Sequence, residues 1–140
     1  MVDVPSPQQD GANIFRSVSG AGPDDVWAVG SITDGWFIEH WDGIAWTVEL
    51  QNTGALLFSV AAVAPDDVWA GGSAYQAPSL IMHWNGQVWS QQPAPQAGSG
   101  SSLSAMGVLA PNDIWAVGNS LSKDGSTLYP LIEHYSGPCV

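Results

Sequence analysis

Short hydrophobic runs separated by turn residues dominate this 140-residue sequence. The runs are rich in β-branched and aromatic residues, as in Val26–Gly30, and such residues favour strands. No segment keeps an apolar period of 3.6 residues, and 16 Gly and 10 Pro interrupt the chain throughout. Both faces of the strand predicted at Val26–Gly30 are apolar, which fits a sheet packed between two other sheets. The pattern predicts an all-β protein made of stacked sheets.

The hydrophobic runs belong to a unit that occurs three times. Its first block reads Pro-Asp-Asp-Val-Trp-Ala-Val-Gly at 23–30, Pro-Asp-Asp-Val-Trp-Ala-Gly-Gly at 65–72 and Pro-Asn-Asp-Ile-Trp-Ala-Val-Gly at 111–118. A second block follows each time and begins at Ile38, Ile81 and Ile132, with the first copy reading Ile-Glu-His-Trp-Asp-Gly. The first blocks are 42 and 46 residues apart. Two blocks in a constant order indicate three structural units of one kind.

Each unit is predicted to hold four short antiparallel strands, A to D. In the first unit, strand A covers Phe15–Ala21, strand B Val26–Gly30 and strand C Phe37–Trp41, and strand D begins at Trp46. The Pro-Asp-Asp segment predicts a tight turn between A and B. The Asp-Gly and Asn-Gly pairs after strand C in the first two units predict two-residue hairpins of type I′.

Four strands in a unit of this length are typical of a β-propeller blade. The pattern Pro-Asp-Asp-Val-Trp-Ala-Val-Gly, Glu-His-Trp-Asp-Gly and Trp resembles the tandem propeller repeats of many bacterial proteins, which are loosely similar to kelch and WD-repeat blades. The resemblance covers essentially the whole chain and implies three propeller blades per chain. It implies little about function, because propellers carry enzymes, lectins and scaffolds.

The third unit reaches the end of the sequence before its strand D. Blade 1 is predicted at 13–50, blade 2 at 55–95 and blade 3 at 102–140, while the stretch 1–10 resembles strand D of blade 2 at Ser90–Pro95. Three blades cannot close a ring, and an open arc exposes two apolar faces and a bare strand edge. We therefore expect a six-bladed homodimer in which the stretch 1–10 of each chain completes blade 3 of its partner. The alternative is a fragment or engineered piece of a longer propeller.

Charge and composition exclude several classes of partner. Arg16 and Lys123 are the only basic residues beside 13 acidic ones, and the net charge of −11 argues against nucleic acid and anionic membranes. No apolar run approaches the roughly 18 residues of a membrane span. The first five residues do not resemble a signal peptide, although few Lys and abundant Ser, Gly and Gln are typical of bacterial secreted proteins. Cys139 is expected at an apolar strand position, and a redox compartment does not follow from one cysteine.

A histidine on strand C and an aspartate in the A–B turn recur in every unit. Imidazole and carboxylate are metal ligands, but symmetric positions on separate blades point around a circle and do not converge. The acidic turns suit Ca²⁺ in chemistry but are explained by turn formation. We expect no metal and no cofactor. The resemblance to WD-type blades implies a structural bond between the two residues in each blade. The three pairs are His40 with Asp25, His83 with Asp67, and His134 with Asp113.

Three aromatic residues do not recur with the repeat and lie in the predicted B–C connections. Trp36, Tyr75 and Tyr129 fall in Ser31–Trp36, Ser73–Leu80 and Asn119–Pro130, whose lengths vary. Variable loops on one propeller face are where binding functions normally lie. These three residues are therefore weak candidates for a ligand site, either for stacking on sugar rings or for ordinary loop packing.

The sequence contains no arrangement that indicates catalysis. Glu39 and Glu133 recur on strand C, but Met82 replaces them in the second unit, and no Ser-His-Asp or paired-carboxylate pattern stands out. We expect a non-enzymatic homo-oligomeric propeller that serves as a scaffold or binding module. A carbohydrate-binding propeller lectin is the alternative function, and a glycan or small ligand is the partner that it implies.

Overall fold

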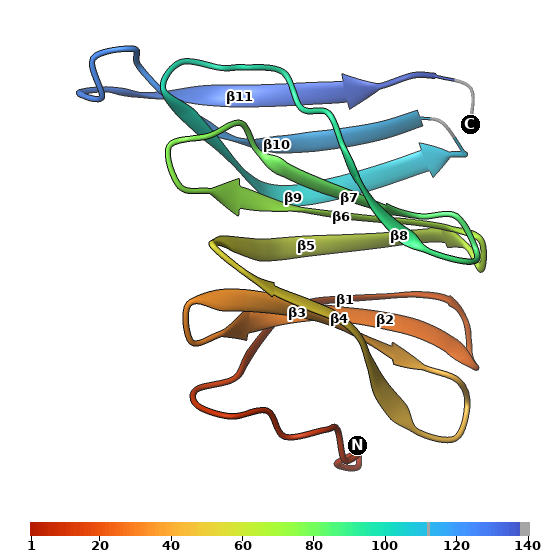
Figure 1. The fold of residues 1–140 in the computed structure, drawn as a ribbon. Helices are drawn as coiled ribbons and strands as arrows, with labels where there is room; N and C mark the ends of the chain where they lie inside the picture. Colours follow the sequence, from red (N-terminus) through yellow and green to blue (C-terminus); the bar gives the residue numbers. More distant parts are fainter. Residues whose placement is uncertain (112, 138–140) are drawn as a thin grey trace.

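The computed structural model describes residues 1–111 and 113–137. These residues form eleven strands and no helix, so the all-β prediction is confirmed. The strands make a four-stranded sheet from the first repeat and a seven-stranded sheet in which the strands of the second and third repeats are joined at the single pair Ser73 and Ser102. We refer to the strands of each repeat as one sheet, and these three stack one on the next along the chain (Figure 1). No helix in this part of the chain is long and apolar enough to cross a membrane.

The first two sheets have four strands each and the third has three within the described residues. Neighbouring strands of a sheet are consecutive in sequence and antiparallel. The first sheet consists of β1 (Ile14–Gly22), β2 (Asp25–Ile32), β3 (Gly35–Trp41) and β4 (Trp46–Thr53). The second consists of β5 (Ala55–Ala64), β6 (Asp67–Ala74), β7 (Leu80–Trp84) and β8 (Trp89–Gln92). The third consists of β9 (Gly100–Ala110), β10 (Asp113–Leu121) and β11 (Leu128–Tyr135).

The turns between strands C and D differ from the prediction. Gly43 has a φ of 91°, but Asp42 does not adopt a positive φ, so the type I′ prediction is wrong. The connection is four residues long, and Asp42 Oδ1 accepts hydrogen bonds from the amides of Ile44 at 2.8 Å and Ala45 at 2.9 Å. The equivalent Asn85 in the second sheet makes the same pair of bonds. The side chain at the first position thus holds the turn and leaves only the glycine in the left-handed region.

The core lies between the first and second sheets. Trp27 is 1% exposed, and its indole ring lies 5.2 Å from that of Trp84 and 5.3 Å from that of Trp89. Val29 and Ile38 beside it are fully buried against the second sheet. The apolar strand at Val26–Gly30 thus packs against a neighbouring sheet, as its sequence pattern predicts. Burial of such large side chains supplies the main stabilisation of the stack.

Serines on the innermost strands join neighbouring sheets. Ser17 Oγ on β1 accepts a bond from the Val60 amide at 3.2 Å, and Ser19 Oγ accepts one from the Ala62 amide at 3.0 Å. Ser59 Oγ on β5 accepts a bond from the Met106 amide at 2.9 Å. The bonds replace strand pairing at the point where adjacent sheets approach each other most closely. They explain why small hydroxyl residues occupy strand A.

The two ends of the stack expose apolar faces. The recurring tryptophan is buried in the first two sheets but 42% exposed as Trp115 in the third, because no further sheet covers it. At the opposite end, Val18 on β1 is 64% exposed, whereas its counterpart Val60 on β5 is 5% exposed. Identical repeat positions therefore differ in burial only because of their place in the stack.

Candidate functional site

Each sheet contains a triad of Asp, Trp and His. In the second sheet, Asp67 Oδ1 accepts bonds from Trp69 Nε1 at 2.7 Å and His83 Nε2 at 2.9 Å, and the two rings stack at 4.2 Å. Asp25 and Asp113 make the equivalent bonds with the Trp and His of their own sheets, at distances between 2.7 and 3.0 Å. One carboxylate oxygen thus fixes both rings in every blade.

This geometry gives the recurring histidines a structural role. The predicted bond between each turn aspartate and its histidine is confirmed in all three sheets. Each Nε2 is occupied by a carboxylate in its own blade. Among the described residues, no three His, Cys, Asp or Glu side chains gather in a way that could hold a metal ion.

The carboxylates of Glu39 and Glu133 are buried without hydrogen-bond partners. Glu39 on β3 has no exposed surface, and neither of its oxygens has a partner in bonding geometry. Burial raises the pKa of Glu39, and the nearby amide of Gln9 offsets this only in part. Burial likewise raises the pKa of Glu133. The second sheet has the apolar Met82 at this position, so the carboxylates are not required by the fold.

We predict that Glu39→Met raises the free energy of unfolding at pH 7 by about 1–3 kcal/mol, because a buried group without a partner costs about that much. A folded pKa above the ordinary 4.5 means that the native state holds its proton to higher pH than the unfolded state. Stability should therefore fall as pH rises from about 4.5 through the raised pKa, and Glu39→Met should flatten this slope. Urea unfolding at several pH values measures both effects.

Glu49→Met is the matched control for this prediction, because Glu49 is exposed on β4 of the same sheet. It should change the free energy of unfolding by less than about 0.5 kcal/mol. A loss of stability in Glu39→Met at neutral pH, with Glu49→Met unaffected, would show that the Glu39 carboxylate has a stabilising partner.

The N-terminal segment lies along the open face of the first sheet (Figure 1). Val4 and Ser6 border a cavity of about 410 Å³ with Phe15, Val18 and Ala28. The predicted strand in the stretch 1–10 is not formed within the single chain, because residues 1–9 belong to no strand. Their side chains nevertheless cover part of the face that a preceding blade would occupy.

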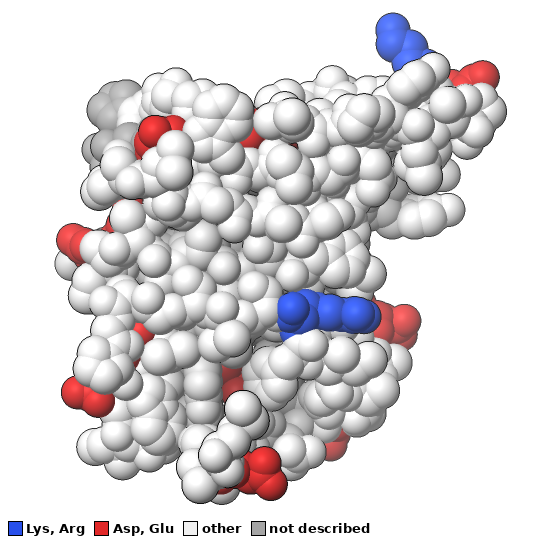
Figure 2. All heavy atoms as spheres, turned by 180° about the vertical axis from the view of Figure 1, so that it is seen from behind, with Lys and Arg blue, Asp and Glu red and all other residues white. Residues whose placement is uncertain are grey.

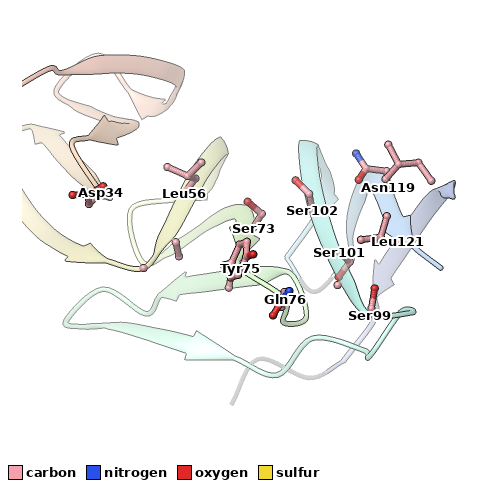
Figure 3. A pocket seen from close by; sticks show the side chains of 15 residues that line it. Asp34, Leu56, Ser73, Tyr75, Gln76, Ser99, Ser101, Ser102, Asn119 and Leu121 are labelled. Atoms are coloured by element: carbon pink, nitrogen blue, oxygen red, sulfur yellow. The ribbon is translucent and has the colours of Figure 1, made fainter. Parts of the chain in front are cut away.

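A larger cavity of about 590 Å³ opens where the variable connections of the second and third sheets meet (Figure 3). We call it the loop-face cavity. Its walls come from the ends of β6 and β10, the starts of β5 and β9, and the adjoining loops. Its lining includes the side chains of Asp34, Leu56, Ser73, Tyr75, Gln76, Ser102, Asn119, Leu121 and Leu128.

The structure separates the three aromatic candidates. Tyr75 lines the loop-face cavity and is 86% exposed. Trp36 lies within β3 and is 3% exposed, so its predicted place in the B–C connection is wrong. The connection is short because Asp34 adopts a positive φ of 61° and closes a tight turn, which draws Trp36 into the core. Tyr129 is exposed at the start of β11 but does not line the cavity.

Most residues that line the loop-face cavity were not predicted from the sequence. Ser73 and Asn119 share the repeat position that follows each first block, but Ser102 has no equivalent polar residue in the other units. Ser73 and Ser102 meet because β6 and β9 approach each other at a single paired position. The variable length of the B–C connections was the signal that pointed to this face. Cys139 and Asn112 lie outside the described residues.

The surface carries no basic patch. The chain has one Arg and one Lys, whose side chains stand far apart, and acidic side chains are scattered between neutral ones (Figure 2). Arg16 Nε donates to Ser31 Oγ at 3.3 Å within its own sheet. Binding of polyanions therefore has no support from the charge distribution.

Comparisons with known proteins identify the fold. No family model matches the sequence, and no curated protein matches it. A solved structure described as "YCF48 bound to D1 peptide" is similar, with a TM-score of 0.54 and 15% sequence identity over 91% of this chain and 46% of that chain. That neighbour is a β-propeller, and the chain is all-β with antiparallel sheets of the same kind. The chain spans about half the length of this neighbour.

Proposed function

We propose that this protein is a non-enzymatic propeller scaffold in which two copies close a six-bladed ring and present binding sites on the loop face. The observation that carries the proposal is the contrast in burial between equivalent positions. Trp115 at one end of the stack and Val18 at the other are exposed, whereas their counterparts between sheets are buried. Two such faces on one chain complete each other when a second copy is added by two-fold symmetry.

The N-terminal segment supports this closure. Val4, Val18 and Ala28 border one cavity, and the residues 88 positions later, Gln92, Met106 and Ala116, border the cavity between the second and third sheets. The N-terminal segment thus takes the same position relative to the first sheet that the end of β8 takes relative to the third sheet. Docking a second copy would carry this segment to the edge of the partner's β11.

The junction between the second and third sheets supports the need for an added strand. Trp69 contacts Tyr135 at 4.8 Å, as Trp27 contacts Trp84 in the first junction. In the first junction, Trp89 on the fourth strand contacts the Trp27 ring. In the second junction, Trp69 and Tyr135 instead line a cavity of about 260 Å³. A strand D supplied by a partner would fill this space.

A binding role without chemistry is supported by the occupied triads. The polar pairs that resemble catalytic groups, Asp with His, are each also bonded to the tryptophan of their own blade. The similar solved protein is described as bound to a peptide, which favours a recognition function for this chain as well. The variable connections of the loop face are where such recognition is expected.

Copurification tests the assembly. Two copies of the chain with different affinity tags, expressed together at equal levels and purified through one tag, should both be recovered, the second copy at about half the amount of the selected one, because like pairs form as well. Recovery of the selected copy alone at micromolar concentration would contradict the ring. Mixing of separately purified copies serves as the control for exchange after purification.

A further inference from the structure

The loop-face cavity has the size of a small-molecule site. Its volume of about 590 Å³ falls within the range of ligand pockets, about 300–1,000 Å³. It is formed within one chain, mainly by the second and third sheets, so its walls do not depend on a partner. Figure 3 shows the side chains of Ser73 and Tyr75 on one side and those of Ser102 and Asn119 on the other.

Four of the polar side chains that line the cavity are neutral and have no hydrogen-bond partner among the described side chains. The hydroxyls of Ser73 and Ser102 and the amides of Gln76 and Asn119 make no side-chain hydrogen bond to another described residue. By contrast, Ser99 Oγ donates to the Ser122 carbonyl, and the hydroxyl of Ser101 bonds to that of Ser79, so both stabilise the loops. Hydroxyl and amide groups both donate and accept hydrogen bonds. Four such groups around one hollow match a ligand that carries several hydroxyls.

Tyr75 and the leucines supply apolar surface beside these polar groups. Tyr75 is exposed at the start of the β6–β7 connection, where folding gives no reason for a large aromatic ring. Leu128 on the opposite wall is also exposed, and Leu56 and Leu121 complete the apolar part of the lining. An aromatic ring next to hydrogen-bonding groups presents a flat apolar face and a polar tip. The C–H face of a sugar ring and its hydroxyls fit this combination.

Charge narrows the class of ligand. Asp34 is the only acidic residue in the lining, and no basic residue lines it. With a net charge of −11, the protein repels phosphates, nucleotides and acidic sugars. A basic peptide would find one carboxylate at the edge of the cavity but four neutral hydrogen-bonding groups inside it. The lining therefore favours a neutral ligand.

We propose that the loop-face cavity binds a neutral pyranose oligosaccharide, with Tyr75 stacked on a sugar ring and Ser73, Ser102 and Asn119 bonded to its hydroxyls. The proposal deepens the binding role proposed above. In the closed ring, the two-fold axis would place both cavities on the same face, so that a long glycan could occupy two sites. Binding to one site does not require the ring, so the two proposals can fail separately.

Isothermal titration with neutral oligosaccharides tests the proposal. The probes are hexasaccharides of β1,4-glucose, β1,3-glucose, α1,4-glucose, β1,4-mannose, β1,4-xylose and β1,4-N-acetylglucosamine. At least one should bind, and Tyr75→Ala and Asn119→Ala should each weaken that binding about fivefold, since a ring contact or hydrogen bond contributes about 1 kcal/mol. Both residues are at the surface of the cavity, so the variants should fold normally.

Tyr129→Ala is the matched control, because Tyr129 is an exposed tyrosine outside the cavity lining. It should leave the affinity unchanged. The proposal is overturned if no probe binds at 10 mM, or if Tyr75→Ala and Asn119→Ala bind as the unmodified chain does. The proposal is also overturned if a basic peptide binds in the same titration, no sugar binds, and Tyr75→Ala weakens the binding of that peptide. The mass of each sample, measured in parallel, shows whether ring closure has failed independently.

Discussion

Asp67→Ala should lower the free energy of unfolding by about 3 kcal/mol. Asp67 is 5% exposed, and its Oδ1 accepts bonds from Trp69 Nε1 and His83 Nε2. Removing the carboxylate leaves two buried donors without an acceptor, and each such group costs about 1–3 kcal/mol. Water cannot replace the lost oxygen easily, because the triad lies between packed sheets. Urea unfolding followed by tryptophan fluorescence measures the change.

The adjacent turn residue provides the control for this prediction. Asp66 is exposed and makes no side-chain hydrogen bond to another described residue, so Asp66→Ala should change stability by less than about 0.5 kcal/mol. Asp67→Asn keeps an acceptor oxygen, so its loss of stability should lie between those of Asp66→Ala and Asp67→Ala. Equal effects of Asp67→Ala and Asp66→Ala would contradict a structural role for the triad.

Ile132→Asp should weaken the association of two chains about 100-fold or more. Ile132 on β11 is 66% exposed, whereas its counterpart Ile38 is fully buried between the first two sheets. In the ring, Ile132 would be buried against the partner's first sheet, and an uncompensated buried charge costs at least about 3 kcal/mol. The dissociation constant, measured by sedimentation equilibrium, should rise accordingly.

Ile44→Asp separates this effect from a general loss of stability. Ile44 is also exposed, but it lies in the β3–β4 turn, away from both open faces. Neither substitution buries a charge in the single chain, so both chains should unfold at the same urea concentration as monomers. Unchanged association in Ile132→Asp would mean that this face of the third sheet is not an interface.

The repeat made most of the fold predictable. The apolar pattern of Val26–Gly30 predicted a strand packed against another sheet, and the recurrence of a turn aspartate and a strand C histidine in every unit pointed to their bond. Recurrence is informative because every blade must satisfy the same packing.

Features without a repeat were harder to predict. The turn at Asp42 depends on side-chain bonds to two amides, and the dipeptide alone does not distinguish this geometry from a type I′ turn. Trp36 reads as a loop aromatic, and only the left-handed turn at Asp34 brings it into the core. The lining of the loop-face cavity combines residues from three blades, so no local pattern contains it.

The mass of the intact chain in solution tests the central claim most directly. Size-exclusion chromatography with light scattering, carried out over a range of protein concentrations, distinguishes one chain from two. We predict a single species of twice the 14.7 kDa of one chain, because both apolar end faces are then covered. A stable monomer of 14.7 kDa across that range would contradict ring closure by a second copy.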